Sequence, residues 1–394
     1  MIDWKPRAQA LSDHLSRAGH LRTPQWREVF ASVPRHEFVP WFFAQTSPGQ
    51  WQRIDTTTTD RHDRWLSAVY SNTTLVTALQ DVALPGTSGH PGFAVAVSSS
   101  TEPGLMAQML EDLDVHPGHT VLEIGTGTGY NAALLCERLG DKNVYSLDLR
   151  ADLVDAATSR LDRAGYHPTL TTTNGSDGLV DHGPYDRIIA TCSVQHIPPA
   201  WIDHLRPGGI LLTDLEGTIY AGSLAALHRL DDTVVEGRFC ARYGSFMPMQ
   251  HQLGIQPGRS HRPDLGTAND RTTTVDPDLL HQRHRPFAFF AQLHLSPGTQ
   301  LHAAAAGART RLVAPDGSWC EITNRSDESG RHHVIEGGPQ PLWQTIERAH
   351  LHYAALGHPG WDRFGITATP TEQHVWLDTP GNDPTWPIPM TTTP

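Results

Sequence analysis

The glycine-rich turn at residues 125–129 constrains the fold of this chain more than any other feature. A short apolar run, Val121–Ile124, leads directly into Gly125, Gly127 and Gly129, and an amphipathic stretch follows. Glycine adopts backbone conformations with positive φ and lets a ligand approach the main chain closely. We therefore predict a buried strand, a tight turn and a helix, with a ligand at the carboxyl end of the strand.

Apolar strands alternate with amphipathic helices over residues 99–215. We expect strands at 121–124, 144–148, 169–172, 186–191 and 210–213, and helices after Pro103 and at 131–139, 152–164 and 199–205. Strands that alternate with helices predict a parallel sheet covered on both faces. The expected fold class is therefore α/β, with a doubly wound, mostly parallel sheet.

The regions on either side of this unit have different patterns. Residues 1–45 have helical periodicity, and residues 46–98 are loop-rich with strand-like pieces at 66–70 and 93–97. Towards the C-terminus we expect strands at 286–295, 310–314 and 319–323, a helix at 342–356 and a hairpin from 365–368 and 374–377. We therefore expect an N-terminal helical and loop segment (1–98), a central domain (99–250), a linker (251–275) and a smaller C-terminal α/β domain (276–394).

Charge and cysteine content exclude several classes of function. The chain has 394 residues and a formal net charge of −12, which argues against a partner such as nucleic acid or an anionic membrane. The cysteines are far apart and the histidines lack metal-ligand spacing, so we expect no metal site. We see no signal peptide and no apolar run of membrane-spanning length, which predicts a cytoplasmic protein. The oligomeric state stays open, with a monomer as our expectation.

Acidic residues recur at the predicted carboxyl ends of strands. Glu123 precedes the first glycine, Asp148 ends the second strand, and Asp177 with Gly178 follows the third. A carboxylate at 148 can accept both hydroxyls of a ribose, and one at 177 can accept a hydrogen bond from an adenine amino group. The alternative is that the glycines only make a tight turn and Asp148 only caps a helix. The three positions together predict a cleft that binds an adenosine without a pyrophosphate.

Several motifs together resemble the protein-L-isoaspartate O-methyltransferase family. They are Glu-Ile-Gly-Thr-Gly-Thr-Gly-Tyr-Asn-Ala-Ala (123–133), Val-Tyr-Ser-Leu-Asp (144–148), Ser-Asp-Gly (176–178), Tyr-Asp-Arg-Ile-Ile-Ala-Thr (185–191), Leu-Arg-Pro-Gly-Gly (205–209), Val-Pro-Arg-His-Glu-Phe-Val-Pro (33–40) and Ala-Val-Tyr-Ser (68–71). The resemblance covers residues 1–250, approximately. It implies a class I methyltransferase with a Rossmann-like sheet, S-adenosyl-L-methionine as cofactor and S-adenosyl-L-homocysteine as product. It assigns to the cofactor Glu123, Gly125, Thr126, Gly127, Gly129, Asp148, Leu149, Asp177 and Gly178.

The family carries Ser-Gln-Pro before the helix that precedes the glycine turn, and this chain reads Thr101-Glu102-Pro103 there. The resemblance implies that the hydroxyl of Thr101 lies near the transferred methyl group, and that Thr101 and Ser100 are the catalytic residues. Glu102 in place of glutamine adds a negative charge close to an anionic substrate. The alternative for Thr101 is that it only forms the N-cap of the helix.

Three further residues are expected to contact substrate. They are Tyr70 in the N-terminal segment, Ser99 before Thr101, and His196 just past the fourth strand. For Tyr70 and His196 a buried structural role is equally open. Since a side-chain carboxylate is ionised at neutral pH, methyl transfer to it needs no general base, and the enzyme contributes alignment and desolvation.

Roughly 140 residues follow the region of resemblance, whereas repair enzymes of this family are usually little more than the catalytic domain. This tail is similar to a longer bacterial branch found with the maturation of lanthipeptides, lasso peptides and ATP-grasp peptides. The similarity implies an enzyme that esterifies an aspartate or isoaspartate carboxylate in a modified, ribosomally made precursor peptide, bound by the C-terminal domain. The ester would then give an aspartimide and isoaspartate.

Two other functions stay open. The first is a general protein-L-isoaspartate(D-aspartate) O-methyltransferase that acts in protein repair. The second is a non-catalytic peptide-binding protein on a methyltransferase fold, against which the intact Gly125, Gly127, Gly129, Asp148 and Asp177 set argues.

Overall fold

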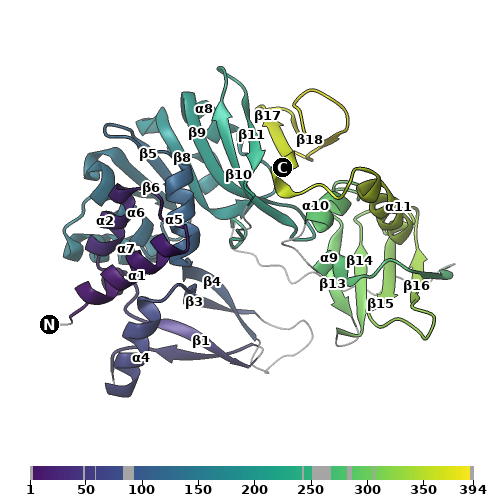
Figure 1. Cartoon of the computed structure of the whole chain (residues 1–394), viewed down its shortest axis with the longest axis horizontal. Coiled ribbons are helices and arrows are strands. Elements are labelled where there is room, and N and C mark those ends of the chain that lie inside the picture. Colours follow the sequence, from purple (N-terminus) through teal and green to yellow (C-terminus); the bar gives the residue numbers. More distant parts are fainter. Residues whose placement is uncertain are drawn as a thin grey trace. The chain divides into compact units, whose positions relative to one another are not determined.

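The computed structural model describes residues 3–47, 49–57, 59–82, 93–241, 244–250, 268–281, 286–304 and 307–390 (Figure 1). The chain divides into two compact units. Unit 1 comprises Met1–Cys192, Asp203–Leu212 and Met249–Pro257, and unit 2 comprises Ser193–Ile202, Thr213–Pro248 and Gly258–Pro394. Within the described ranges, none of the helices is both long enough and apolar enough to cross a bilayer.

Unit 1 opens with the helices α1 (Lys5–Arg17), α2 (Pro24–Ser32), α3 (Arg35–Phe38) and α4 (Thr59–Val69). The apolar face of α1 is buried, as its spacing predicts. Two expectations for this region were wrong. Helical structure does not run to residue 45, because β1 begins at Phe42, and the strand expected at 66–70 lies mostly in α4. Trp65, Leu66 and Val69 are buried together because their spacing places them on one helix face.

An antiparallel sheet follows, with strand order β2-β1-β3-β4. Its strands are β1 (Phe42–Ser47), β2 (Gln50–Ile54), β3 (Leu75–Val82) and β4 (Phe93–Ser100), the last of which confirms the strand expected at 93–97. Ser99 and Ser100 at the end of β4 pair with Val76 and Leu75 of β3. The chain then passes into α5 (Pro103–Asp112), the helix predicted after Pro103.

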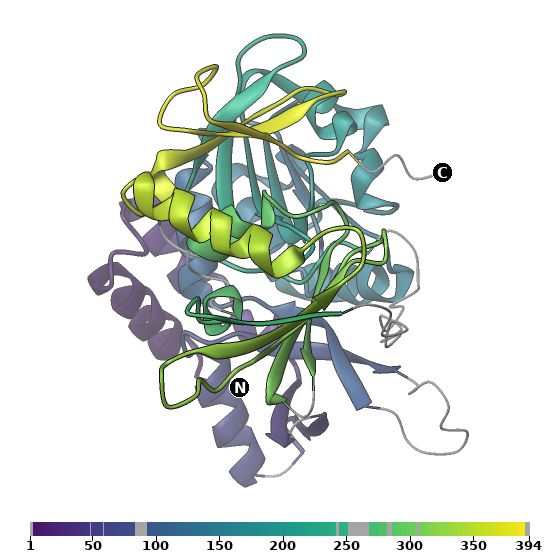
Figure 2. The same cartoon turned by 90° about the vertical axis from the view of Figure 1, so that its right-hand side faces the viewer.

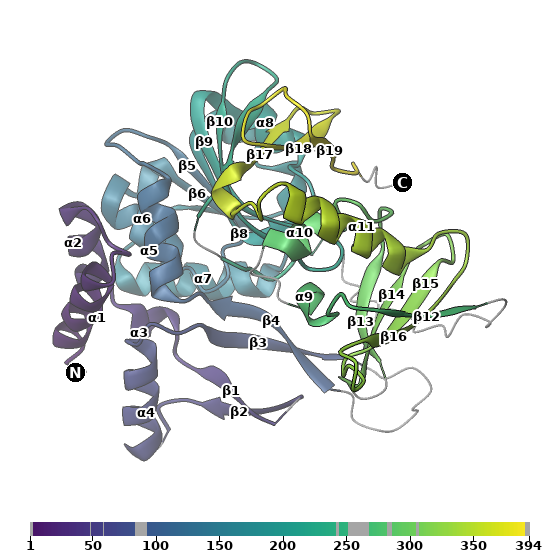
Figure 3. The ribbon, with the colours of Figure 1, turned by 45° about the vertical axis from the view of Figure 1, so that its right-hand side comes forward.

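The centre of unit 1 is a parallel sheet with strand order β8-β5-β6-β7. Its strands are β5 (Val121–Ile124), β6 (Val144–Asp148), β7 (Thr169–Thr172) and β8 (Tyr185–Val194), and β8 ends in unit 2. The helices α6 (Tyr130–Leu139) and α7 (Ala151–Ala164) connect them, with short 3-10 turns η1 (Asp141–Asn143), η2 (Gly175–Asp177) and η3 (Val180–His182) (Figure 3). The predicted α/β class and parallel sheet are confirmed.

Two elements after β8 lie close to their predicted positions. They are α8 (Pro199–His204) and β9 (Leu205–Glu216), and β9 begins in unit 1 and ends in unit 2.

Unit 2 has antiparallel strands in the order β19-β18-β17-β11-β10. These are β10 (Gly222–Arg229), β11 (Val235–Phe239), β17 (Phe364–Ala368), β18 (Gln373–Leu377) and β19 (Thr385–Pro387). The hairpin of β17 and β18 was predicted. The pairing of β17 with β11 was not predicted. This pairing connects the C-terminal hairpin to residues that precede the expected linker.

A second antiparallel sheet in unit 2 has strand order β12-β16-β15-β14-β13. Its strands are β12 (Asn269–Thr273), β13 (Gln300–Ala304), β14 (Arg309–Val313), β15 (Trp319–Thr323) and β16 (His332–Gly337). The helix α11 (Leu342–Ala355) lies across this sheet (Figure 2), and α9 (Asp278–His281), α10 (Pro286–Gln292) and η5 (Trp361–Arg363) complete the unit.

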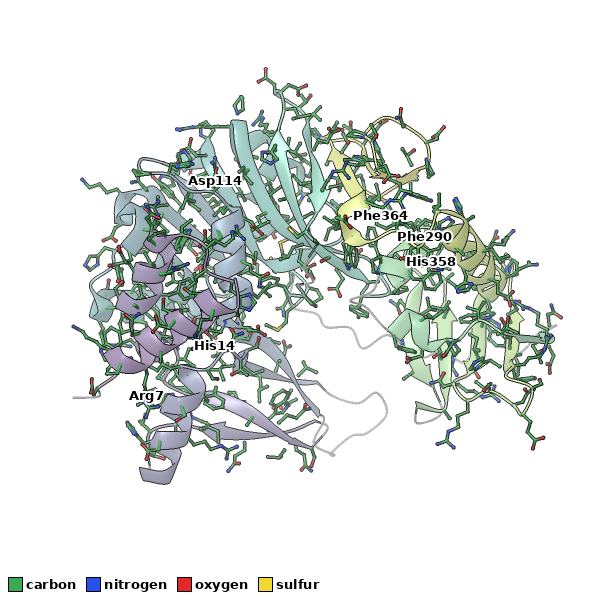
Figure 4. All side chains as sticks on the ribbon, in the orientation of Figure 1. Arg7, His14, Asp114, Phe290, His358 and Phe364 are labelled. Atoms are coloured by element: carbon green, nitrogen blue, oxygen red, sulfur yellow. The ribbon has the colours of Figure 1, made fainter. Side chains whose placement is uncertain are left out.

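The strand expected at 286–295 is wrong, since this segment is the helix α10. Its aromatic side chains project to several sides at once. Phe290 lies 5.3 Å from the Tyr353 ring of α11 and 6.2 Å from the Phe364 ring of β17, measured between ring centroids (Figure 4). Phe287 also contacts the Tyr353 ring, at 5.4 Å, whereas Phe289 contacts the Phe239 ring of β11, at 4.9 Å. A strand would direct Phe287 and Phe289 to the same face, whereas a helix directs them to different sides.

The division into units differs from the domain boundaries that we expected. Residues 213–248 belong to the same unit as most of the C-terminal half, because β11 pairs with β17. The expected linker contains β12, while residues 251–267 of that linker lie outside the described residues.

Candidate active site

The glycine turn follows β5 and has the conformation that its sequence predicts. Gly125, Gly127 and Gly129 have φ values of 98°, 50° and 85°. The backbone N–H groups of Gly125 and Thr126 donate to the carbonyl of Leu147 over 2.8 and 3.0 Å. These two bonds attach the turn to the end of β6.

The side chains around the turn explain two of its glycines. A Cβ at Gly125 would come within 2.6 Å of Thr191 Oγ1, which donates to the Gly125 carbonyl over 2.8 Å. A Cβ at Gly129 would lie 3.2 Å from that of Ala157, so this glycine permits the close approach of α7. A Cβ at Gly127 would meet protein atoms only at 3.8 Å or more. Among the described residues, a methyl group at Gly127 would therefore make only ordinary van der Waals contacts, so protein packing does not require a glycine at this position.

Asp148 ends β6 beside the turn. Its Oδ2 accepts a hydrogen bond from the N–H of Gly127 over 3.0 Å, and its Oδ1 accepts one from the N–H of Arg150 over 3.1 Å. Arg150 is the N-cap residue of α7. The carboxylate of Asp148 therefore bonds both the N-terminal end of this helix and the glycine turn. Burial raises the pKa of Asp148 above its ordinary value, although the two N–H groups oppose this. Leu149 follows and is half-buried.

Glu123 is fully buried beneath the turn. Its Oε1 accepts a hydrogen bond from Asn131 Nδ2 over 2.7 Å, and its Oε2 accepts one from Ser146 Oγ over 2.5 Å. Ser146 in turn lies 2.7 Å from Thr126 Oγ1. Burial raises the pKa of Glu123 to about 7, against the effect of its two donors. Hydrogen bonds through Ser146 therefore connect Glu123 to Thr126 of the turn.

The turn after β7 places Asp177 on the surface and buries Gly178. It is held by Asn174, whose Oδ1 accepts from Ser176 N over 3.2 Å, and whose carbonyl accepts from Asp177 N over 3.1 Å. Gly178 has a φ of 66°. The exposed carboxylate of Asp177 thus follows the strand next to the one that Asp148 ends.

The end of β4 lies beside the glycine turn. A Cβ at Gly127 would be 3.8 Å from the carbonyl oxygen of Ser99 and 3.9 Å from Ser98 Oγ. The structure therefore brings Ser99 together with the predicted cofactor residues. The half-exposed Thr101 follows two residues later.

Thr101 is not the N-cap of α5, so that alternative was wrong. The N-cap is Glu102, and Asn72 accepts the N–H of Gly104 at Oδ1 over 2.6 Å. Asn72 Nδ2 also donates to Glu102 Oε1 over 3.1 Å. An asparagine from a distant loop therefore caps this helix, which no local pattern in the sequence indicated.

Tyr70 is buried, and its hydroxyl lies 2.8 Å from His36 Nδ1. Burial raises the pKa of Tyr70 and lowers that of His36. His196 is half-exposed and belongs to unit 2, where its neighbour Ile197 exchanges hydrogen bonds with Gln373. Contact of His196 with a substrate remains a prediction.

Two residues near the turn were missed by sequence reasoning. Thr191 ends the predicted strand at 186–191, so its position could have identified it. Arg35 lies in the quoted motif at 33–40, and its fully buried guanidinium donates to Ser100 Oγ over 3.2 Å and to the Thr101 carbonyl over 3.1 Å.

A parallel sheet with a glycine turn after β5 and an acidic residue at the end of β6 is typical of class I methyltransferases and of other Rossmann-like nucleotide-binding domains. Residues 6–252 match the protein-L-isoaspartate(D-aspartate) O-methyltransferase family, PCMT, and the chain belongs to this family. It is therefore an S-adenosyl-L-methionine-dependent carboxyl O-methyltransferase of proteins or peptides.

The relatives agree with this assignment. The chain is 31% identical over 207 residues to protein-L-isoaspartate O-methyltransferase 2 of Syntrophobacter fumaroxidans, covering 52% of this chain and 67% of that protein. It is 28% identical over 257 residues to protein-L-isoaspartate O-methyltransferase of Methanopyrus kandleri, covering 64% and 95%. A solved protein-L-isoaspartate O-methyltransferase structure, 20% identical, aligns with a TM-score of 0.53 over 94% of this chain and 100% of its own. That fold therefore extends over most of the C-terminal half as well.

Proposed function

We propose that this enzyme methylates isoaspartyl residues in proteins and peptides generally, as in protein repair. The names of its relatives support this substrate class. A solved structure named protein-L-isoaspartate O-methyltransferase aligns over 94% of the chain and also supports the proposal. Because that structure includes a similar C-terminal half, this half does not by itself indicate an enzyme that modifies precursor peptides. Family membership leaves no reason to retain the non-catalytic alternative.

The structural observation that supports methyl transfer at this site is the position of Ser99 beside Gly127. Gly127 belongs to the turn that we assign to the cofactor, and Ser99 and Thr101 belong to the segment that we assign to the methyl acceptor. A methyl donor and an acceptor carboxylate must meet within about 3–3.5 Å for transfer. This is the place in unit 1 where the two assigned segments adjoin.

The residues present fit S-adenosyl-L-methionine. In our assignment Gly125, Gly127 and Gly129 face the methionine part, Asp148 accepts the ribose hydroxyls, and Asp177 with Gly178 accepts the adenine. The glycine at position 127, which protein packing does not require, and the half-buried Asp148 are consistent with this. Glu123, with both oxygens bonded inside the protein, would act on Thr126 through Ser146. Leu149 would line the ribose side.

When bound, the cofactor supplies a methyl group activated by a sulfonium. The protein then has to hold the acceptor carboxylate in line with that group and to exclude water. We assign the orientation of the carboxylate to the hydroxyls of Thr101 and Ser99, with Ser100 supporting them from its bond to Arg35. No proton has to leave the carboxylate, since it is ionised at neutral pH.

Mass spectrometry of matched peptides tests the proposal. A peptide with one isoaspartyl residue and the same peptide with aspartate are each incubated with enzyme and S-adenosyl-L-methionine. We expect a methyl ester on the isoaspartyl peptide only. Turnover of neither peptide would reject a general repair function.

Tailoring of a modified precursor peptide is the second candidate. The observation that favours it is the Thr101-Glu102 pair, which departs from the Ser-Gln of the family. A cyclised precursor peptide is therefore the third substrate in the experiment. Methylation of that peptide alone would establish the tailoring function instead.

A further inference from the structure

Arg35 is the first residue of α3, and its side chain is fully buried. Its guanidinium donates to five oxygen atoms of two distant segments, the carbonyls of Val69 (2.7 Å), Ser71 (3.1 Å), Thr73 (3.4 Å) and Thr101 (3.1 Å) and the hydroxyl of Ser100 (3.2 Å). One side chain thus joins the loop after α4 to the end of β4.

No carboxylate forms an ion pair with Arg35 among the residues that the structure describes. Its guanidinium carbon lies over the Tyr130 ring, 5.7 Å from the ring centroid. Burial lowers the pKa of Arg35 to about 10, so the group stays charged at neutral pH. A buried cation is costly unless hydrogen bonds satisfy it, and an apolar side chain of similar volume often gives equal or greater stability. Stability alone is therefore a poor explanation for an arginine here.

The atoms that Arg35 holds lie where alignment matters. Ser100 and Thr101 directly follow Ser99, whose carbonyl lies beside Gly127. Ser71 and Thr73 flank Asn72, which caps α5 and contacts Glu102. The planar guanidinium presents its donors at fixed angles, whereas a lysine has a single nitrogen. Only arginine can hold both segments in one arrangement.

We propose that Arg35 is a positioning residue for methyl transfer, and that its guanidinium sets the position of Ser99–Thr101 against the glycine turn. The effect on the reaction rests on the proposed function of this site. The mechanical part, in which Arg35 orders this end of β4, stands whichever peptide is the substrate.

The test compares wild type with Arg35→Ala and Arg35→Lys. We expect both variants to bind S-adenosyl-L-homocysteine within about threefold of wild type by calorimetry, because the assigned cofactor residues are untouched. We expect kcat on the isoaspartyl peptide to fall by about 100-fold, as for a misplaced reacting group. Guanidinium chloride at about 10 mM is far too dilute to unfold a protein, and we expect it to raise kcat of Arg35→Ala at least tenfold. Methylammonium, which lacks the planar donors, should not.

Arg187 of β8 offers a control arginine, which differs from Arg35 in forming an ion pair with Asp114 at 3.8 Å. It too is buried, and it donates to the carbonyls of Leu113 (2.7 Å) and Asp114 (2.8 Å), the latter labelled in Figure 4. Arg187→Ala should lower the Tm, keep kcat within a few-fold and show no rescue. Wild-type kcat in Arg35→Ala, or a loss that guanidinium does not restore, would overturn the proposal.

Hydrogen exchange separates this proposal from the proposed function. In Arg35→Ala we expect faster exchange of the amides of residues 99–101, slowed again by guanidinium. If wild type fails to methylate the isoaspartyl peptide, the proposed function is rejected. The exchange result then still decides whether Arg35 orders this segment, and unchanged exchange would overturn the positioning role.

Discussion

The backbone N–H of Gly127 donates to Asp148 Oδ2 over 3.0 Å, and this bond joins the turn after β5 to the end of the neighbouring strand β6. The carboxylate is thereby held with its second oxygen on Arg150 N. Both residues lie at the carboxyl ends of parallel strands, where ligands bind in sheets of this kind. The predictions below follow from the contacts around this pair.

Asp148→Ala removes the acceptor of Gly127 N–H and the assigned acceptor of the ribose. A hydrogen bond to a charged group contributes about 2 kcal/mol, which corresponds to roughly 30-fold in affinity. We therefore expect calorimetry to show at least that loss for S-adenosyl-L-methionine. Asp152→Ala, which removes an exposed partner of Arg150, is the control and should bind as wild type does. Equal affinity in both variants would contradict the assignment of Asp148.

Alanine substitutions at Gly127 and Gly129 should affect different properties, cofactor affinity at Gly127 and thermal stability at Gly129. At Gly127 the added methyl group meets no protein atom closer than 3.8 Å, and only the left-handed φ of 50° opposes it, at about 1–2 kcal/mol. We expect Gly127→Ala to fold with a slightly lower Tm and to lose cofactor affinity.

At Gly129 the added methyl group lies 3.2 Å from Ala157 Cβ, so it presses on α7. Gly129→Ala should lower the Tm more than Gly127→Ala does, and Ala157→Gly should restore part of it. Thermal unfolding of the two single variants and the double variant decides this. The absence of any rescue would mean that the strained φ of 85°, not the contact, is the cause.

Thr101→Val tests the role of the hydroxyl. Because Glu102, and not Thr101, is the N-cap of α5, we expect the free energy of unfolding to change by no more than about 0.5 kcal/mol, as for ordinary surface substitutions. The Tm should therefore change little. We expect kcat to fall roughly 10- to 100-fold, while Thr101→Ser keeps most of it. A fall in Tm with unchanged kcat would return Thr101 to a structural role.

Glu102→Gln removes a negative charge close to the assigned acceptor segment but keeps an oxygen for Asn72 Nδ2. We expect the KM of the anionic isoaspartyl peptide to fall about two- to fivefold at low salt, with kcat unchanged. Because exposed charges are screened within about 8 Å at physiological salt, the difference should shrink when salt is raised. Steady-state kinetics of both proteins at two ionic strengths checks this. A KM difference between variant and wild type that does not change with salt would contradict it.

Glu123→Gln should change the pH dependence of stability. In the folded protein the pKa of Glu123 is about 7, whereas its ordinary value is 4.5. Between these values the folded state binds a proton that the unfolded state does not, so stability falls as pH rises through this window and levels off above it. The variant lacks this loss, and its Tm relative to wild type should therefore rise from pH 5 to pH 8. A constant difference would show that Glu123 titrates normally.

Local patterns were sufficient for the centre of unit 1. The strands at 121–124, 144–148 and 169–172 occupy the residues that were predicted. The first of them, β5, is paired on both sides and buried throughout, and such a strand is a continuous apolar run. The strand at 169–172 is a polar strand at the edge of the sheet, and its position was predicted from the alternation of strands and helices. The glycine spacing identified the turn, and Asp148 at a strand end identified the edge of the sheet to which we assign the ligand. Each of these depends on neighbours along the chain, so each can be read from the residue order.

Short apolar runs outside that centre were misassigned. The segments at 66–70 and 286–295 resemble strands, yet they lie in α4 and α10. A run of this length has no clear period, and its state depends on what packs against it. For Phe290 that is Tyr353 and Phe364, both far along the chain.

Tertiary structure alone decided the contacts that bring distant segments together. Nothing in the motif at 33–40 indicates that Arg35 donates to residues near 70 and near 100, or that Asn72 caps α5. The pairing of β11 with β17 is equally absent from any local pattern. Strand and turn formation depend on successive residues. These contacts form because buried polar groups need hydrogen-bond partners, and in the fold those partners come from segments far apart in the sequence. Local sequence patterns therefore do not indicate which segments will meet.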